Sequence, residues 1–179
     1  MRLALLKVAR FSRRPIFVKL WILPVWLMLG IAKLLVFNVS FRHLLPFLGK
    51  PVGVAPWIPL SSEEEESRAR MISSVVSTAA RFTPWDSNCF PQAIVARVLL
   101  GLYGVRYCLY FGIRKVAGEE PFDAHTWIAT GRVAVVGRRS FRRYIVVGVF
   151  ASPVLARSLA NELQDFSGRG SPDSGGRIR

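Results

Sequence analysis

One change of pattern constrains the fold of this chain more than any other feature. Up to Gly104 the apolar residues repeat at the spacing of a helix, and beyond it they alternate. The last helical stripe consists of Phe90, Ile94, Val98 and Leu102. The first alternating run consists of Val105, Tyr107, Leu109 and Phe111. The chain is therefore predicted to place its helices first and its strands afterwards, which is an α+β arrangement.

The second half of the chain continues with strand signals. Residues 125–129 and 132–136 flank a tight turn at Thr130-Gly131, which predicts a hairpin. Residues 144–150 read as a further strand, and 153–166 as a closing helix. The remainder, 167–179, is rich in Gly, Ser and Arg and is predicted to be disordered.

The most hydrophobic stretch lies near the N-terminus, at residues 16–37. Lys19 and Lys33 leave 13 uncharged residues between them, whereas a membrane-spanning helix needs about 20. This pattern favours a buried or partner-facing helix. Shallow association with a membrane surface and a true span are the alternatives, and five basic residues favour the former: Arg10, Arg13, Arg14, Arg42 and Lys50.

A shorter helix is expected over 40–49, and a proline-rich loop over 50–60. Ser62 and Glu65 have the spacing of a capping box, and the glutamates at 63–66 suit the positive end of a helix dipole. We expect three segments: an apolar helical region at 1–60, a core at 61–166 and the tail at 167–179.

Composition narrows the functional classes. The formal net charge is +14, but the basic residues are scattered and no nucleic-acid-binding motif is present, so nucleic acid is not an expected partner. Cys89 and Cys108 make no disulfide framework. The N-terminus lacks a secretory signal, which predicts a cytoplasmic protein with reduced thiols. Two cysteines and two histidines at irregular spacing predict neither a zinc site nor another cofactor.

One cysteine and one histidine carry the predicted chemistry. Cys89 follows Ser87 and Asn88, either of which is a good N-cap, so the thiol lies at a helix N-terminus. The unpaired N–H groups there favour a thiolate and stabilise an oxyanion. His125, on a strand, is the candidate general base. Cys108 lies in mid-strand and is interpreted as structural.

Two motifs support this pair. The first is the segment 88–93, Asn-Cys-Phe-Pro-Gln-Ala, and the second is 122–127, Phe-Asp-Ala-His-Thr-Trp. Together with 103–106 and the strand at 109–113, they resemble lasso-peptide biosynthesis B proteins in their stand-alone leader-peptidase form. The resemblance covers roughly residues 10–150. It implies a papain- or transglutaminase-like core, in which the helix that bears the nucleophile packs on an antiparallel sheet.

The resemblance also implies a function and partners. Cys89 would attack the carbonyl at the junction of leader and core in a ribosomally made precursor, with His125 moving the proton. A separate leader-recognition protein would present the precursor, and an ATP-dependent cyclase would use the freed amine. Gln92 is a candidate oxyanion donor, and Trp85 and Trp127 are candidates for the substrate channel, although a core role is favoured for both.

The sequence departs from the family in one respect. Such families place an Asp about a dozen residues past the histidine, but no Asp, Asn, Glu or Gln occurs between His125 and Asn161. Three explanations are open: a Cys–His dyad whose ring is oriented by a backbone carbonyl, substitution by Asp123, or an impaired enzyme that acts as a membrane-associated scaffold. Acyl transfer to an amine is a further alternative.

Overall fold

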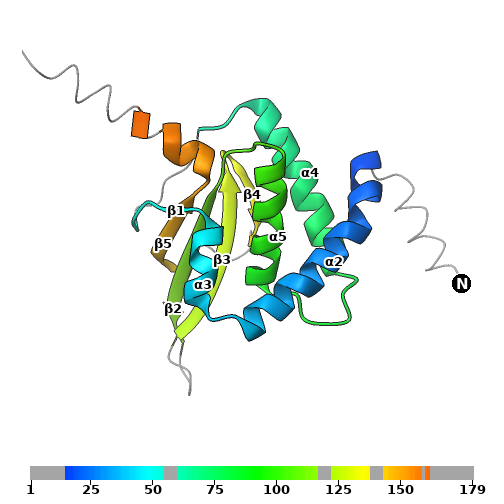
Figure 1. Cartoon of the computed structure of the whole chain (residues 1–179), viewed down its shortest axis with the longest axis horizontal. Coiled ribbons are helices and arrows are strands. Elements are labelled where there is room, and N and C mark those ends of the chain that lie inside the picture. Colours follow the sequence, from blue (N-terminus) through cyan, green and yellow to red (C-terminus); the bar gives the residue numbers. More distant parts are fainter. Residues whose placement is uncertain (1–14, 55–59, 117–121, 138–142, 159, 162–179) are drawn as a thin grey trace, which may run out of the picture.

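The structure is a computed structural model, and it describes residues 15–54, 60–116, 122–137, 143–158 and 160–161. Apart from the two-residue strand β1, the helices precede the strands: α2 (Ile16–Asn38), α3 (Phe41–Leu48), α4 (Glu63–Ala80) and α5 (Cys89–Leu102). The strands are β1 (Lys50–Pro51), β2 (Cys108–Lys115), β3 (Phe122–Thr130), β4 (Val133–Val136) and β5 (Ile145–Ala151). This order confirms the predicted α+β class (Figure 1).

The strands form one antiparallel sheet in the order β1-β5-β2-β3-β4. The central strand β2 pairs with β3 from Cys108↔Ala129 to Lys115↔Phe122. Its pairing with β5 shifts register between Phe111 and Gly112. On one face of the sheet Leu109 and Ile128 join the main core beneath the helices, whereas on the other face Tyr110 and Trp127 belong to a smaller cluster.

Helices α5 and α4 lie side by side on the sheet, and α2 packs against both of them (Figure 1). Six residues of α5 are buried: Pro91, Ala93, Val95, Ala96, Leu99 and Leu100. They meet Val75, Val76 and Ala79 of α4 and Leu29 of α2 in one continuous core. The small side chains of Ala93 and Ala96 allow the neighbouring elements to approach closely.

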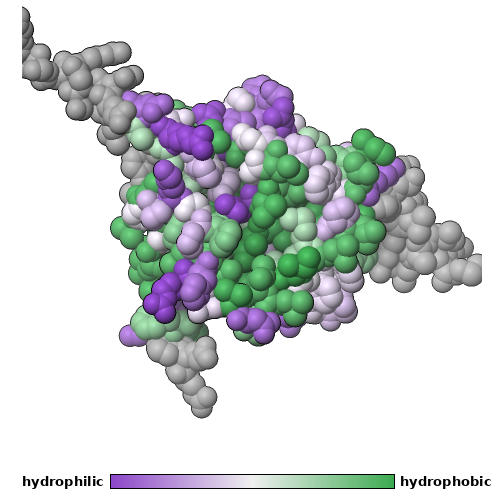
Figure 2. Space-filling view, viewed as in Figure 1, coloured by the Kyte–Doolittle hydropathy of each residue, from purple (hydrophilic) through white to green (hydrophobic). Residues whose placement is uncertain are grey.

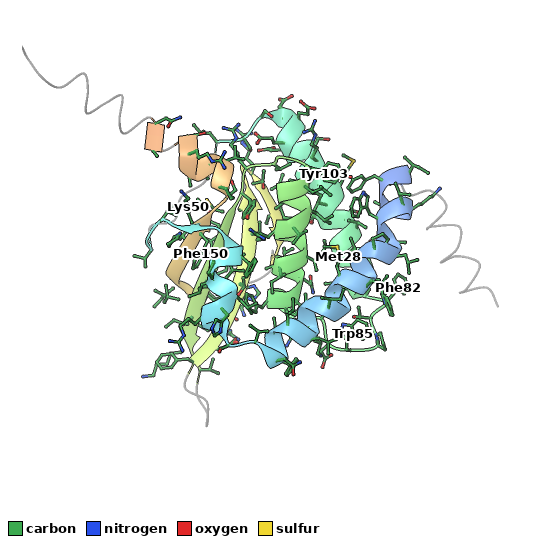
Figure 3. The ribbon with its side chains drawn as sticks, viewed as in Figure 1. Met28, Lys50, Phe82, Trp85, Tyr103 and Phe150 are labelled. Carbon is green, nitrogen blue, oxygen red and sulfur yellow. The ribbon has the colours of Figure 1, made fainter. Side chains whose placement is uncertain are left out.

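Helix α2 is fixed to this layer by its inner face. Val18, Val25, Leu29 and Ala32 are buried there. Trp21 donates a hydrogen bond from Nε1 to the Tyr103 hydroxyl at 2.8 Å, and Trp26 donates one from Nε1 to the Phe82 carbonyl at 3.1 Å. Figure 3 shows Tyr103, Phe82 and Trp85 along the course of α2. By length and composition α2 is able to cross a membrane, but one face of it belongs to the domain core.

The predicted capping box is present at the start of α4. The Ser62 hydroxyl accepts from the Glu65 backbone N–H, and the Glu65 carboxylate accepts from the Ser62 backbone N–H. The Glu65 carboxylate also accepts hydrogen bonds from the Arg106 side chain, the shortest at 2.7 Å. The backbone N–H of Arg106 donates a further one at 3.0 Å. The Arg106 hydrogen bonds, opposed by burial, lower the pKa of Glu65 to about 2. This ion pair joins α4 to the segment between α5 and β2.

Several boundaries differ from the predicted ones. The strand expected from Val105 begins at Cys108, because Arg106 is held by Glu65 outside the ladder. His125 does not open its strand but is its fourth residue, since β3 pairs with β2 as far back as Phe122. The hairpin turn lies at Gly131-Arg132, because Thr130 still pairs with Val133.

The first part of the expected 50–60 loop contributes to the sheet. Lys50 and Pro51 form strand β1 opposite Ala151 and Phe150. The sheet therefore takes up two residues of the segment 1–60, ahead of the segment expected to form the core. The closing helix is present from Pro153 to Ser158, and the expected disordered tail lies outside the described residues.

We expect Glu65→Gln to lower the free energy of unfolding by about 1.5–3 kcal/mol, the contribution of hydrogen bonds to a charged group. Since the folded-state pKa of Glu65 lies below its usual value, this contribution is complete above about pH 4.5 and is lost as the pH falls towards 2. Urea unfolding across this range measures both effects. Glu64→Gln, which removes an exposed pair with Arg68, should cost less than about 1 kcal/mol; equal losses in both variants would contradict the assignment.

Candidate active site

Cys89 is the first residue of α5 and is half-buried. Asn88 is the N-cap but makes no side-chain capping hydrogen bond, and Pro91 has no N–H to offer. The backbone N–H groups of Cys89 and Phe90 therefore lie in the first turn without a cap from Asn88. A thiol in this place is next to the positive end of the helix dipole, and the same N–H groups suit a developing oxyanion.

His125 lies on β3, opposite Gly112 of β2. Its Nε2 hydrogen-bonds the backbone carbonyl of Gly137 at 3.3 Å. Gly137 has a φ of 78°, and a Cβ there would lie 2.6 Å from the Trp127 Cβ, so only glycine fits this backbone without strain. A carbonyl accepts only from a protonated nitrogen, which makes Nδ1 the basic nitrogen of the neutral ring.

Tyr144 is a neighbour of both candidate catalytic residues. Its ring centroid lies 5.0 Å from that of His125. Burial and the hydrogen bond to Asp123 raise the pKa of Tyr144, and the nearby Cys89 contributes in the same direction. Tyr144 is thus a neutral donor at physiological pH that contacts the His125 ring and lies within electrostatic range of Cys89.

Asp123 is part of a charged network and not a solvated loop residue. Its Oδ2 accepts hydrogen bonds from the Tyr144 hydroxyl at 2.7 Å and from Arg114 Nε at 2.8 Å. The hydrogen bond from Tyr144 lowers the pKa of Asp123 most, and the hydrogen bond from Arg114 lowers it further. Asp123 is therefore ionised at neutral pH. The Arg114 guanidinium also lies 5.2 Å from the Tyr144 ring centroid. Asp123 thus fixes the Tyr144 ring beside the imidazole.

The other candidates have distinct places. Gln92 turns back over the start of its helix, where Nε2 donates to the Ser87 carbonyl at 2.6 Å and keeps a second hydrogen for a ligand. Trp85 packs against Trp26, with ring centroids 5.2 Å apart. Trp127 is buried and stacks on Tyr110 at 5.3 Å. Trp127 has the packing of a core residue and also contacts the His125 ring, with centroids 6.0 Å apart, whereas Trp85 is half-buried against α2.

The remaining cysteine and histidine lie elsewhere. Cys108 is fully buried at the start of β2, and this burial raises its pKa to about 11. His43 lies exposed on α3, where its Nδ1 is 3.5 Å from the Ser40 hydroxyl. Cys108 belongs to the cluster on which Tyr144 packs, but it pairs with Ala129, four residues along β3 from His125.

Three residues of this network were missed by sequence reasoning: Gly137, Tyr144 and Arg114. Gly137 acts through its backbone carbonyl, which every residue possesses. Tyr144 was read only as the start of a strand. For Arg114 a signal existed, because the pairing of β2 with β3 places it opposite Asp123. The sequence of the loop between the two strands does not determine this register, so the pair was not predicted.

Helix α5 opens with a cysteine and packs on an antiparallel sheet whose strand β3 carries a histidine. This arrangement is typical of enzymes that use a cysteine thiol. The sequence matches the family described as the Transglutaminase-like superfamily over residues 34–148, more than half of the chain. The chain belongs to this superfamily, which includes cysteine peptidases. Comparisons with curated proteins and with solved structures gave no significant match.

We expect iodoacetamide to modify Cys89 in the folded protein and to leave Cys108 unmodified. Cys89 is half-buried at a helix N-terminus, whereas Cys108 is buried with a raised pKa. Peptide mass mapping after brief labelling near neutral pH distinguishes the two sites. Cys89→Ala should take up label only after unfolding. Preferential labelling of Cys108 would contradict the placement of both thiols.

Proposed function

We propose that this chain is a cysteine peptidase that removes the leader from a lasso-peptide precursor. The observation that carries the proposal is a thiol at the start of α5 within electrostatic range of Tyr144, whose ring contacts a histidine held at Nε2 by a backbone carbonyl. The superfamily match supports the fold of a cysteine peptidase. The resemblance of segments 88–93 and 122–127 to lasso-peptide B proteins supports the substrate.

In the proposed reaction the Cys89 sulfur attacks the carbonyl carbon at the junction of leader and core. The thiol proton passes to Nδ1 of His125, and the N–H groups at the start of α5, with the Gln92 amide, bind the oxyanion. The leaving amine of the core peptide takes the proton from His125, so that a thioester to the leader remains. Water then hydrolyses the thioester with His125 as the base, and the free thiol is restored.

The proposal includes a compartment and partners. The protein would act in the cytoplasm, with a leader-recognition protein that presents the precursor and an ATP-dependent cyclase that consumes the freed core. The second candidate function is a scaffold of the same complex with weak catalysis, favoured by the absence of an acidic residue beyond His125 in the sequence up to Asn161. Transfer of the acyl group to an amine is the third.

We expect precursor cleavage by the wild type and none by Cys89→Ala or His125→Ala. Mass spectrometry of the precursor, co-expressed with the leader-binding partner, reads the result. Cys108→Ala and His43→Ala are matched controls and should keep cleavage, because Cys108 lies four residues along β2 from Gly112, the partner of His125, and His43 is exposed on α3. Equal cleavage by every variant would remove the pair from the mechanism.

The product mass and partner binding separate the alternatives. Hydrolysis adds one water to the products, whereas transfer to an amine does not. A scaffold would bind the leader-recognition protein without cleaving its precursor, and Cys89→Ala would then behave as the wild type in every assay.

Tyr144 is expected to act as a positioning residue for His125. Tyr144→Phe keeps the ring contact but loses the hydroxyl bond to Asp123, and Tyr144→Ala loses both. We expect kcat to fall about tenfold or more in the Ala variant, equal to about 1.4 kcal/mol, and less in the Phe variant, with KM unchanged. The pH profile of kcat should move in both.

Tyr103→Phe is the matched control, since the Tyr103 hydroxyl accepts from Trp21 at the other end of α5. It should leave both kcat and the pH profile unchanged. A purely structural role of Tyr144 would instead lower thermal stability without moving the pH profile, and that result would contradict the positioning role.

A further inference from the structure

The outer face of α2 carries an apolar stripe that nothing in the described structure covers. It consists of Ile16, Leu20, Leu23, Leu27, Ile31 and Leu34, whose exposed fractions range from 52% to 79%. Their spacing of three and four residues places them on one side of the helix. Figure 2 shows hydrophobic surface along the course of α2. Six exposed aliphatic side chains in one row form a continuous apolar patch. Such a patch is typical of a contact surface, unlike single exposed apolar residues scattered over a protein.

The inner face of the same helix excludes a membrane-spanning role in this fold. Four residues of α2 are buried against α4 and α5, and Trp21 and Trp26 are hydrogen-bonded to the rest of the domain. Lys33 donates from Nζ to the Asp86 carbonyl at 3.0 Å, just ahead of Cys89. A spanning α2 would break all of these contacts. Only its outer side is available, so α2 contacts a partner along its length of about 35 Å.

Charge identifies the chemistry of that partner. The 15 residues that precede α2 in the sequence include five Lys or Arg and no acidic residue. Basic residues next to an apolar face add about 1 kcal/mol each to binding at an anionic lipid surface. The six side chains of the stripe are aliphatic, and the next turn of α2 adds one exposed ring, Phe37, whereas the centres of protein interfaces are rich in aromatic residues, Met and Arg. The tryptophans at 21 and 26 point inward, away from the stripe.

We propose that the outer face of α2 docks the protein on an anionic lipid bilayer, with the helix lying parallel to the surface. The aliphatic stripe enters the boundary between headgroups and acyl chains, and the positive charge of the protein attracts the anionic headgroups. These are the two signals that a stable peripheral attachment requires. The docking is independent of the peptidase reaction, because the stripe contains neither Cys89 nor His125.

Co-sedimentation of the full-length protein with vesicles tests the proposal. We expect binding to vesicles of phosphatidylcholine with phosphatidylglycerol, weaker binding to phosphatidylcholine alone, and release by high salt. The double variant Leu23→Glu/Leu27→Glu should bind the anionic vesicles at least about tenfold more weakly. Ile145→Glu is the matched control, since Ile145 is 73% exposed on β5, and it should bind as the wild type does.

Thermal unfolding of each variant shows whether the substitutions leave the fold intact, as their exposed positions predict. A stripe that docks a protein would give no binding of the wild type to anionic vesicles, and this result would overturn the proposal. Unchanged binding by the double variant would also overturn it. Retention on the vesicles after a high-salt and alkaline wash would show insertion and would overturn the parallel orientation.

Discussion

The enclosure of helix α5 is the constraint on which the rest of this structure depends. The helix contacts α2, α4, β3 and β4, and side chains on most of its circumference are buried. A helix held in this way has a fixed N-terminus, so the position of Cys89 is set by the whole core and not by a local loop. A nucleophile on such a support loses little freedom when it reacts, which is the condition for efficient positioning.

Helix α2 connects this core with the outer surface. Its inner face holds the segment that leads into α5, through Trp26 on the Phe82 carbonyl and Lys33 on the Asp86 carbonyl. Gly30 belongs to the same contact, because a Cβ there would lie 3.1 Å from the Trp85 ring. Any partner or surface that contacts the outer face of α2 therefore contacts the same helix that holds the segment before Cys89. This gives an attached protein a defined orientation of its candidate site.

The sequence predicted the elements better than it predicted their contacts. The capping box at Ser62 and the start of α5 at Cys89 follow from local spacing, and both are confirmed. The bond between Glu65 and Arg106 joins residues 41 positions apart, and local patterns hold no information on such pairs. Gly137 is the sharpest case: the position where an Asp was expected holds a glycine, and the interaction comes from its carbonyl.

A carbonyl in place of a carboxylate has physical consequences for catalysis. In a triad, replacing the carboxylate by an amide costs about 10⁴-fold in rate, because the imidazole takes the wrong tautomer. The Gly137 carbonyl accepts only from N–H, so it keeps the proton on Nε2 and avoids that loss. What it lacks is a full negative charge to balance the imidazolium. Asp123 is a nearby negative charge: its hydrogen bonds from Tyr144 and Arg114 lower the pKa of its carboxyl most, and its attraction to His125 adds to the same direction. The arrangement therefore retains orientation in full and charge compensation in part.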